Sequence, residues 1–422
     1  MSAPVPVVGV GADGLDGLAP RSRRVLEAAT AIHGSPRQLE LVADLGVPLY
    51  PWPSPLVPAL PVLFGEIARS DAAIVASGDP MFHGIGSTLA RIIGPQRLHV
   101  YPAPSSASLA AARLGWPLAG LDVHSCVTAD PHVVLATARP GGRALVLCRD
   151  ASTPAALARV LVDAGLGESA LTVLADLGAR AESRHALTAT ELTGAIEITG
   201  ASARWSDLCV AAVEYRAAPG AAVVPGGPAP GLPDAAYAND GQLTKRVARA
   251  VTVAALDPHP GALLWDIGGG SGSIGIEWSR MAPGARAVAV ERDPGRAGRI
   301  RANAIRLGVP GLDVVEGAAP AALDGLPRPD AVFVGGGVTA PGLLDACWDA
   351  LRPGGRLVAA AVTLESERVL ADRHATHGGT LTRLGVETAE PLGSFTGWRP
   401  ARPVVHLECV KPVEPSEEGS TP

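Results

Sequence analysis

A glycine-rich turn between an apolar strand and a helix is the feature that most constrains this chain. LLWDI predicts a buried strand, and IGIEWSRM predicts the helix that follows it. Glycines in such a turn let the backbone approach a ligand closely, and the first amides of the helix remain free to donate to it. The turn therefore predicts a ligand-binding loop of an α/β domain, made by Asp266, Ile267, Gly268, Gly269, Gly270, Ser271 and Gly272.

An acidic residue at the end of the next strand indicates what that ligand carries. RAVAVE predicts the strand, and Glu291 ends it, 23 residues after Gly268 (291 − 268 = 23). A carboxylate at this distance can accept hydrogen bonds from both hydroxyls of a ribose. An ordinary strand–helix turn with an acidic surface residue would look similar, but the combination favours an adenosine ligand.

Other nucleotide-binding loops fit this turn less well. The dinucleotide pattern G-x-G-x-x-G puts Ser273 at its last glycine when it starts at Gly268, and it reaches Gly275 only when it starts at Gly270. A Walker A phosphate loop is excluded, because neither Lys245 nor Lys411 follows the required glycines. The turn more closely resembles the G-x-G-x-G loop of class I methyltransferases.

A Pro/Gly/Ala-rich stretch divides the 422 residues into two parts. AAPGAAVVPGGPAPGLP (217–233) lacks apolar periodicity and predicts a linker. We expect domains at 1–216 and 232–411, a linker at 217–231 and a disordered polar tail at 412–422. Apolar segments alternate with helical ones on both sides of the linker, which predicts two α/β domains with parallel strands. The pattern of the second domain is typical of a doubly wound sheet.

The alternation gives approximate positions for the elements. In the first domain we expect strands at 5–11, 72–80, 98–104, 143–149 and 171–178, and helices at 20–31, 87–93, 107–114 and 154–164. In the second domain we expect strands at 263–267, 286–293, 312–317, 330–337 and 355–363, and helices at 274–281, 294–307 and 341–351.

The charge balance and the cysteines argue against several kinds of protein. The net charge of −6 disfavours a nucleic-acid binder. The five cysteines are scattered and form no C-x-x-C pair, so we expect free thiols in a reducing compartment. His374 and His377 lie three residues apart but lack a third ligand nearby, so no metal site is expected. With no apolar run near the ~18 residues of a membrane span, we expect a cytoplasmic protein that contacts neither membrane nor nucleic acid.

The second half closely resembles the class I methyltransferase domain that acts on precorrins at carbon-15. The resemblance covers about 232–410 and rests on GLPDAAYANDGQLTKR, LLWDIGGGSGSIGIEW, AVERDP, VEGAAPAAL, PDAVFVGGG, LRPGGRLVAAAVTLES and GSFTGWRP. It implies a Rossmann-like class I methyltransferase fold. It also implies that S-adenosylmethionine is surrounded by Thr244, the loop Gly268–Gly272, Glu291 and Ala319. The chain departs from the family pattern at Ala318, where an acid is usual, and near Ala360, where Asn is usual.

The first half resembles the tetrapyrrole methylase family, in the branch that methylates precorrins at carbon-5. The resemblance covers about 6–214 and rests on GVGADGLDGLAP, GSPRQLEL, SGDPMFHGIGSTLA, PAPSSASLAAARLGWPLAGLDVHS and LTVLADLGARAESRHAL. It implies two α/β lobes with S-adenosylmethionine between them. The residues that it places at this second cofactor are Gly9, Gly78, Asp79, Pro80, Ser105 and Ser106. Taken singly, each of these motifs is explained by ordinary turn chemistry.

The two resemblances together imply one activity. They imply methylation of a precorrin-6 intermediate at carbon-5 and carbon-15, with decarboxylation of the ring C acetate, which gives precorrin-8 on the route to cobalamin. The macrocycle itself can take up the electrons released on decarboxylation, so no metal is required. The proton-transfer and other catalytic residues are not assigned, and we expect a homo-oligomer.

Several side chains have two interpretations. Arg246, Arg249 and Arg399 are candidates to bind substrate carboxylates, although a solvated helix face is the simpler interpretation of the first two. Trp265, Trp278 and Phe333 could stack on a macrocycle, but their strand and helix settings favour core packing.

Two alternatives to the bifunctional enzyme remain. The first is an RNA methyltransferase, which the acidic balance disfavours. The second is a C-terminal methyltransferase with a non-catalytic, tetrapyrrole-binding N-terminal domain. It remains because Cys126-Val127-Thr128-Ala129 stands where the carbon-5 branch usually has Leu-His-Gly-Arg.

Overall fold

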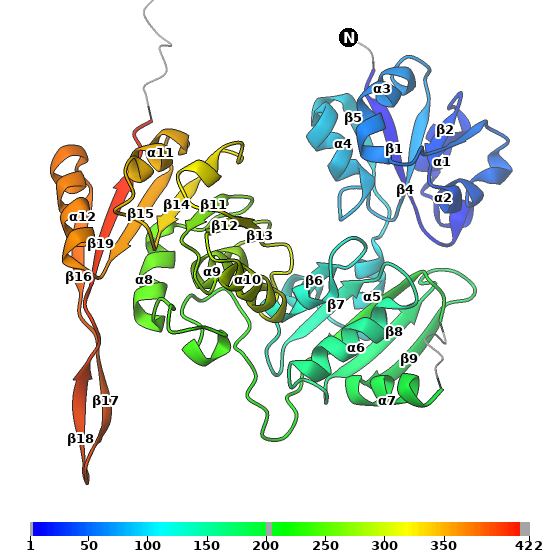
Figure 1. Ribbon diagram of the computed structural model, residues 1–422. Coiled ribbons are helices and arrows are strands. Elements are labelled where there is room, and N and C mark those ends of the chain that lie inside the picture. Colours follow the sequence, from blue (N-terminus) through cyan, green and yellow to red (C-terminus); the bar gives the residue numbers. More distant parts are fainter. Residues whose placement is uncertain (1–2, 200–204, 414–422) are drawn as a thin grey trace, which may run out of the picture. The chain divides into compact units, whose positions relative to one another are not determined.

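The protein forms two compact units, which are described separately (Figure 1). The structure, a computed structural model, describes residues 3–199 and 205–413, so most of the tail predicted at 412–422 lies outside the described residues. Met1–Pro131 and Pro140–Pro219 make the first unit, and His132–Arg139 and Gly220–Pro422 make the second. No helix in the described part of the chain is long and apolar enough to cross a membrane.

The first sheet of unit 1 has the strand order β3-β2-β4-β1-β5, and its strands pair in parallel. Its strands are β1 (Val5–Val10), β2 (Ile32–Gly34), β3 (Leu49–Pro51), β4 (Ala73–Ser77) and β5 (Leu98–Tyr101). Alternate residues of β1 and β4 face opposite sides, so α1 (Pro20–Glu27) and α2 (Pro36–Glu40) pack on one face, and α3 (Leu56–Ile67) and α4 (Ile85–Ile93) on the other. The expected helix at 20–31 is shorter, because the chain enters β2 at Ile32.

The second sheet of unit 1 has the order β6-β7-β10-β8-β9. Its elements are β6 (Asp122–Ser125), β7 (Arg143–Leu147), β8 (Ala170–Ala175), β9 (Ser183–Thr188), β10 (Cys209–Glu214), α5 (Ser106–Leu114), α6 (Thr153–Asp163) and α7 (Ala189–Thr199). Only β6 and β7 are parallel neighbours, so the prediction of parallel strands is wrong here. The connection 176–182 between β8 and β9 is too short for a parallel crossover, which needs about a dozen residues.

Unit 2 is built on one sheet with the order β13-β12-β11-β14-β15-β19-β16. Five strands are parallel: β11 (Leu263–Ile267), β12 (Arg286–Glu291), β13 (Asp313–Glu316), β14 (Ala331–Val334) and β15 (Arg356–Ala361). β19 (Val404–Val410) runs antiparallel to β15 and to β16 (Thr380–Leu384). The strand order reverses between β11 and β14, which is where a doubly wound sheet binds its ligand.

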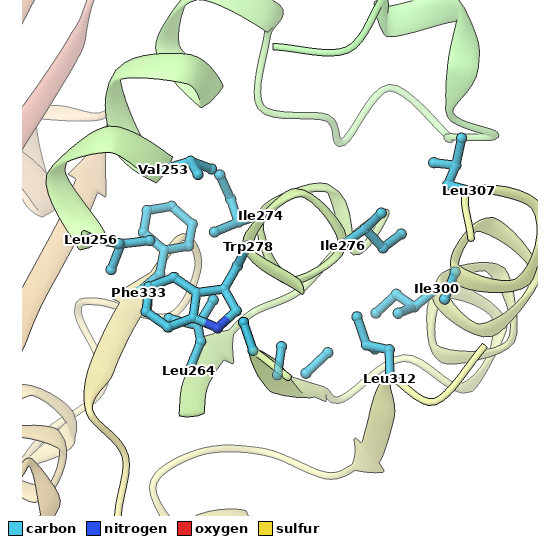
Figure 2. Packing of buried hydrophobic residues seen from close by; sticks show 14 of the residues in the cluster. Val253, Leu256, Leu264, Ile274, Ile276, Trp278, Ile300, Leu307, Leu312 and Phe333 are labelled. Atoms are coloured by element: carbon cyan, nitrogen blue, oxygen red, sulfur yellow. The ribbon is translucent and has the colours of Figure 1, made fainter. Parts of the chain in front are cut away.

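Helices cover both faces of this sheet, as predicted. α8 (Arg246–Leu256), α9 (Ser273–Met281) and α10 (Pro294–Arg306) pack on one face, and α11 (Leu343–Ala350) and α12 (Leu364–His377) on the other. Figure 2 shows Trp278 of α9 beside Phe333 of β14 in the first of these layers. Trp265, Trp278 and Phe333 are all buried, so the prediction that they pack in the core is confirmed.

A two-stranded hairpin extends from the edge of unit 2 (Figure 1). It consists of β17 (Glu387–Leu392) and β18 (Phe395–Pro400), which pair antiparallel with each other. Neither this hairpin nor the antiparallel strands β16 and β19 were predicted from the sequence. The predicted α/β class is confirmed for both units.

Candidate functional site

The loop after β11 lies against the loop after β14. Gly268 adopts a left-handed conformation with φ 72°, and a Cβ at this position would lie 2.8 Å from the Cα of Gly336. Only a residue without a side chain permits two backbones to pass this closely. The amides of Gly268 and Gly269 both donate to Val290 O, at 2.9 and 3.2 Å. The loop that follows β11 is thereby hydrogen-bonded to β12 and lies against the loop after β14, at the point where the strand order reverses.

The carboxylate of Glu291 joins this loop to the start of α10. One oxygen accepts from the amide of Gly270 at 2.9 Å, and the other accepts from the amide of Asp293 at 3.0 Å. Glu291 is buried, and each of its oxygens retains capacity for a second hydrogen bond. The carboxylate can therefore hold the loop and still accept from a ligand.

The two other residues predicted at this cofactor lie on neighbouring segments. The amide of Gly317 donates to Glu291 O at 3.0 Å, so the loop that carries the half-buried Ala319 follows β13 beside the end of β12. Thr244 is also half-buried and precedes α8.

A segment before α8, residues 231–245 and here called the strap, lies over the glycine loop. The hydroxyl of Ser271 donates to Gln242 O at 2.7 Å. The carboxamide of the buried Asn303 accepts from Ala238 N at 3.0 Å and donates to Ala238 O and to Ser271 O, both at 2.9 Å. Asn303 is thus a positioning residue that ties the strap and the glycine loop to α10. This role of Asn303 was not predicted, because nothing in the sequence distinguishes Asn303 from any other helical asparagine.

A buried ion pair holds the other end of the strap. Arg249 Nε lies 2.6 Å from Glu277 Oε1, and the side chains are 0% and 2% exposed. Glu277 also accepts from the amides of Gly231 and Leu232, at 2.6 and 2.9 Å. Arg249 is therefore occupied within the protein and is neither a solvated helix residue nor available to a substrate carboxylate. Both interpretations given above for Arg249 are wrong, because the sequence did not show that Glu277 faces it.

The other two candidate arginines are exposed. Arg246 lies at the start of α8, and Arg399 lies on β18, where its Nη1 atom is 2.9 Å from Glu390 Oε2. The pKa of Arg399 is raised above its ordinary value, mainly by the hydrogen bond to Glu390 and secondarily by Coulombic attraction to the same residue.

In unit 1, the segments that follow β1, β4 and β5 meet backbone to backbone. The amide of Gly78 donates to Val10 O at 2.9 Å, and the amide of Ala103 donates to Gly78 O at 3.2 Å. A Cβ at Gly9 would overlap the carbonyl oxygen of Gly78. A Cβ at Gly78, whose φ is 57°, would lie 3.1 Å from the Cα of Ser105. The fold therefore brings Gly9, Gly78 and Ser105 together at the carboxyl ends of parallel strands.

The remaining predicted residues of unit 1 shape the same loops. Asp79 Oδ1 accepts from the amide of Met81 at 2.9 Å, and Pro80 is buried against Gly84 and Gly86. Ser105 is the N-cap of α5 and accepts from Ser108 N at 3.1 Å; Ser106 is the first residue of that helix.

The loop after β6 lacks the arginine of the family pattern, and the structure places another arginine beside it. Cys126 is buried, and burial raises the pKa of its thiol to about 11, so it offers no charged group. Arg149, which follows β7, reaches this loop and donates from Nε to Val127 O at 2.9 Å. An arginine is thus present beside the loop, although it comes from another strand. Arg149 was not a candidate from the sequence, because only the parallel pairing of β6 with β7 brings Arg149 beside the loop after β6.

Within the described part of the chain, no cluster of three or more His, Cys, Asp or Glu side chains could hold a metal ion. His374 and His377 lie in the last turn of α12. The five cysteines are free and buried.

We predict that Asp266 makes the stability of the protein pH-dependent. Burial raises its pKa to about 7, and Glu291 adds to the effect. Because the folded state favours the neutral acid, the contribution of Asp266 to stability is greatest below the ordinary pKa of ~4 and falls as the pH rises to about 7. Asp266→Asn retains an acceptor for the amide of Gly275, which lies 2.9 Å from Oδ2. The free energy of unfolding of the variant should therefore fall less than that of the parent between about pH 4 and 7, the range between the two pKa values.

Urea denaturation at several pH values measures this difference. The exposed Asp313 on β13 provides the control, and Asp313→Asn should leave the pH dependence unchanged. Equal slopes for the parent and Asp266→Asn would contradict the prediction.

Two family models match separate parts of this chain. The family model for tetrapyrrole (corrin/porphyrin) methylases matches residues 4–193, and the model for the precorrin methyltransferase domain matches residues 235–411. The precorrin-6Y C(5,15)-methyltransferase (decarboxylating) of Sinorhizobium sp is 45% identical over 409 residues, which is 96% of either chain. The protein of the same name from Mycobacterium tuberculosis (strain ATCC 25618 / H37Rv) is 45% identical over 414 residues, covering 96% of this chain and 99% of the relative.

A solved structure is also similar to part of this chain. It is the C-terminal domain of precorrin-6Y C5,15-methyltransferase from Rhodobacter capsulatus, which is 48% identical and covers 44% of this chain and 100% of its own, with a TM-score of 0.42. The predicted pair of folds, a tetrapyrrole methylase and a precorrin methyltransferase of class I, is confirmed by the two family models. Because the 45% identity extends over 96% of the chain and so over both domains, this chain belongs to the precorrin-6Y C(5,15)-methyltransferase (decarboxylating) family.

Proposed function

We propose that this protein methylates a precorrin-6 intermediate at carbon-5 and carbon-15 and removes the acetate carboxyl of ring C, giving precorrin-8 in cobalamin biosynthesis. One observation carries the proposal: two separate glycine-lined sites lie in two units, and the chain matches both a tetrapyrrole methylase model and a precorrin methyltransferase model. The protein is a methyltransferase, as its relatives are. Incubation with the reduced precorrin-6 substrate and mass spectrometry of the product test the whole reaction.

S-Adenosylmethionine fits the site in unit 2 as the methyl donor. A Cβ at Gly270 would meet only two backbone oxygens, at 3.4 and 3.9 Å, so there is room above the loop. Glu291 beside it offers unused lone pairs to ribose hydroxyls. We assign the cofactor to Thr244, Gly268–Gly272, Glu291 and Ala319 in unit 2, and to Gly9, Gly78–Pro80, Ser105 and Ser106 in unit 1. The bound cofactor supplies an electrophilic methyl group on a sulfonium.

The protein's own contribution is to align the reactants and exclude water. Transfer of a methyl group to carbon is an in-line displacement, so a fixed distance and direction between the two molecules lowers the barrier. Asn303 and Glu291 fix the loop that presents the cofactor, and the strap covers it. The electron-rich macrocycle is itself the nucleophile and, once methylated, the electron sink for decarboxylation. No side chain needs to form a covalent intermediate.

The two alternative functions are less well supported. An RNA methyltransferase does not account for two precorrin-related family matches in one chain. A non-catalytic N-terminal domain does not account for 45% identity to a C(5,15)-methyltransferase along the full chain, and Arg149 places a guanidinium at the loop that lacks the family's arginine. Five free, buried thiols support a reducing compartment such as the cytoplasm.

Replacement of Glu291 should weaken cofactor binding in unit 2. Glu291→Ala removes a side-chain acceptor and releases the amide of Gly270, which should cost about 1.5–3 kcal/mol of binding free energy. Isothermal titration of the full chain with S-adenosylhomocysteine measures it, and the site in unit 1 serves as an internal reference. Glu316 pairs in register with Glu291 but is exposed, so Glu316→Ala is the matched control. Unchanged affinity at both sites would rule out this role for Glu291.

The two domains should divide the chemistry. Gly270→Val places a branched side chain in the cofactor space at a φ of 59°, so it should abolish one methylation together with the loss of carbon dioxide. Asp79→Arg fills the loop of unit 1 and should do the reverse, leaving one methyl transfer with carbon dioxide still released. Each product carries one added methyl group and the two differ in mass by one carbon dioxide, so mass spectrometry separates them. If Asp79→Arg left both methylations intact, unit 1 would not be a methylase.

We further propose that the protein is a homo-oligomer, assembled through the β17–β18 hairpin. Leu392, Phe395 and Trp398 on this hairpin are 69%, 78% and 72% exposed, an apolar surface that a second copy would bury. Replacing all three with Ser should reduce the mass measured by sedimentation velocity to that of a single chain. Leu364→Ser, at an exposed leucine on α12, should leave the assembly intact. A monomeric parent protein would refute the proposal.

A further inference from the structure

Residues 132–139, here called the docking segment, come from the N-terminal half of the sequence but belong to unit 2. The chain leaves unit 1 after Pro131, returns to it at Pro140, and enters unit 2 a second time at Gly220. The family model for tetrapyrrole methylases covers the docking segment without a break, so the sequence gives no sign of this excursion.

The side chain of Arg280 contacts three separate parts of unit 2. Arg280 lies in the last turn of α9 and is 8% exposed. Its guanidinium donates to Leu307 O at the end of α10, to Pro225 O at 2.8 Å and to Leu135 O of the docking segment at 3.4 Å. A buried guanidinium needs such acceptors, because it retains its charge away from water.

Backbone atoms of the docking segment come unusually close to the rest of unit 2. The amide of Gly227 donates to Ala136 O at 3.1 Å. A Cβ at Gly226 would overlap the carbonyl oxygen of Ala138, and a Cβ at Gly308 would overlap the amide of Ala136. Two glycines are therefore required where the segment lies, and Val134 and Ala138 of the segment are buried. This close fit distinguishes the contact from a loop that merely passes over a surface.

We propose that the docking segment is a recognition element. It packs against residues 225–227, Arg280 and Gly308, and through these contacts the N-terminal half of the chain binds the C-terminal domain non-covalently. The linker is then not the only connection between the two halves, and cutting it should not separate them. This inference is independent of the catalytic activity of either domain.

A nicked protein tests the proposal. Pro219 and Gly220 are exposed, so a protease recognition sequence can be inserted between them and cleaved after the whole chain has folded. The two halves of the parent protein should still elute together in gel filtration. Gly226→Ala should raise their dissociation constant about tenfold or more, since the added methyl group overlaps Ala138.

A matched variant and a second readout keep the test decisive. Gly311 is exposed, with open space where its Cβ would be, so Gly311→Ala should leave the dissociation constant unchanged. In the uncut chain, hydrogen exchange at the amide of Gly227 should accelerate in Gly226→Ala and in Arg280→Met, but not in Gly311→Ala. The proposal is overturned if the parent halves separate on cleavage, or if Gly226→Ala changes neither the dissociation constant nor this exchange rate.

Discussion

The buried ion pair between Arg249 and Glu277 is the interaction on which the C-terminal site depends. Burying two charges is costly, and the attraction between them compensates only when their remaining hydrogen-bonding capacity is used. Here the Glu277 carboxylate also accepts from Tyr237 Oη at 3.0 Å and from the amides of Gly231 and Leu232. The pair therefore fixes the start of the strap, and the strap in turn places Gln242 O over Ser271 in the glycine loop.

The sites of both units lie where parallel strands end, because the loops that follow such strands converge at one edge of the sheet. The contacts that hold these loops differ between the two units. In unit 1 the loops after β1, β4 and β5 are joined to one another by backbone hydrogen bonds, and neither Gly9 nor Gly78 leaves room for a side chain. In unit 2 a carboxylate does part of this work, because Glu291 joins the glycine loop to α10.

Much of this architecture could be predicted from the sequence, and the remainder depends on contacts between distant residues. The loop at Gly268, the acid at Glu291 and most helices of both domains follow from local patterns of apolar residues and glycine. The mixed second sheet of unit 1 did not follow, since β10 inserts between β7 and β8 and no local pattern shows that pairing. The functions of Arg249 and Asn303 were also hidden, because their partners lie 28 and 65 residues away along the chain.

The domain boundary illustrates the same limit. A Pro/Gly/Ala-rich composition shows where a chain lacks regular structure, but it does not show whether that stretch is packed. Val224 packs against the core of unit 2, and Pro225 and Gly227 hydrogen-bond to Arg280 and Ala136. These residues lie within the stretch predicted as a linker, yet residues 226 and 227 pack directly against residues 132–139. Glycine has two functions in this stretch: it interrupts helix and strand, and it permits the close backbone approach at Gly226. Only the second requires a partner, and that partner, Ala138, is encoded 88 residues earlier in the chain (226 − 138 = 88).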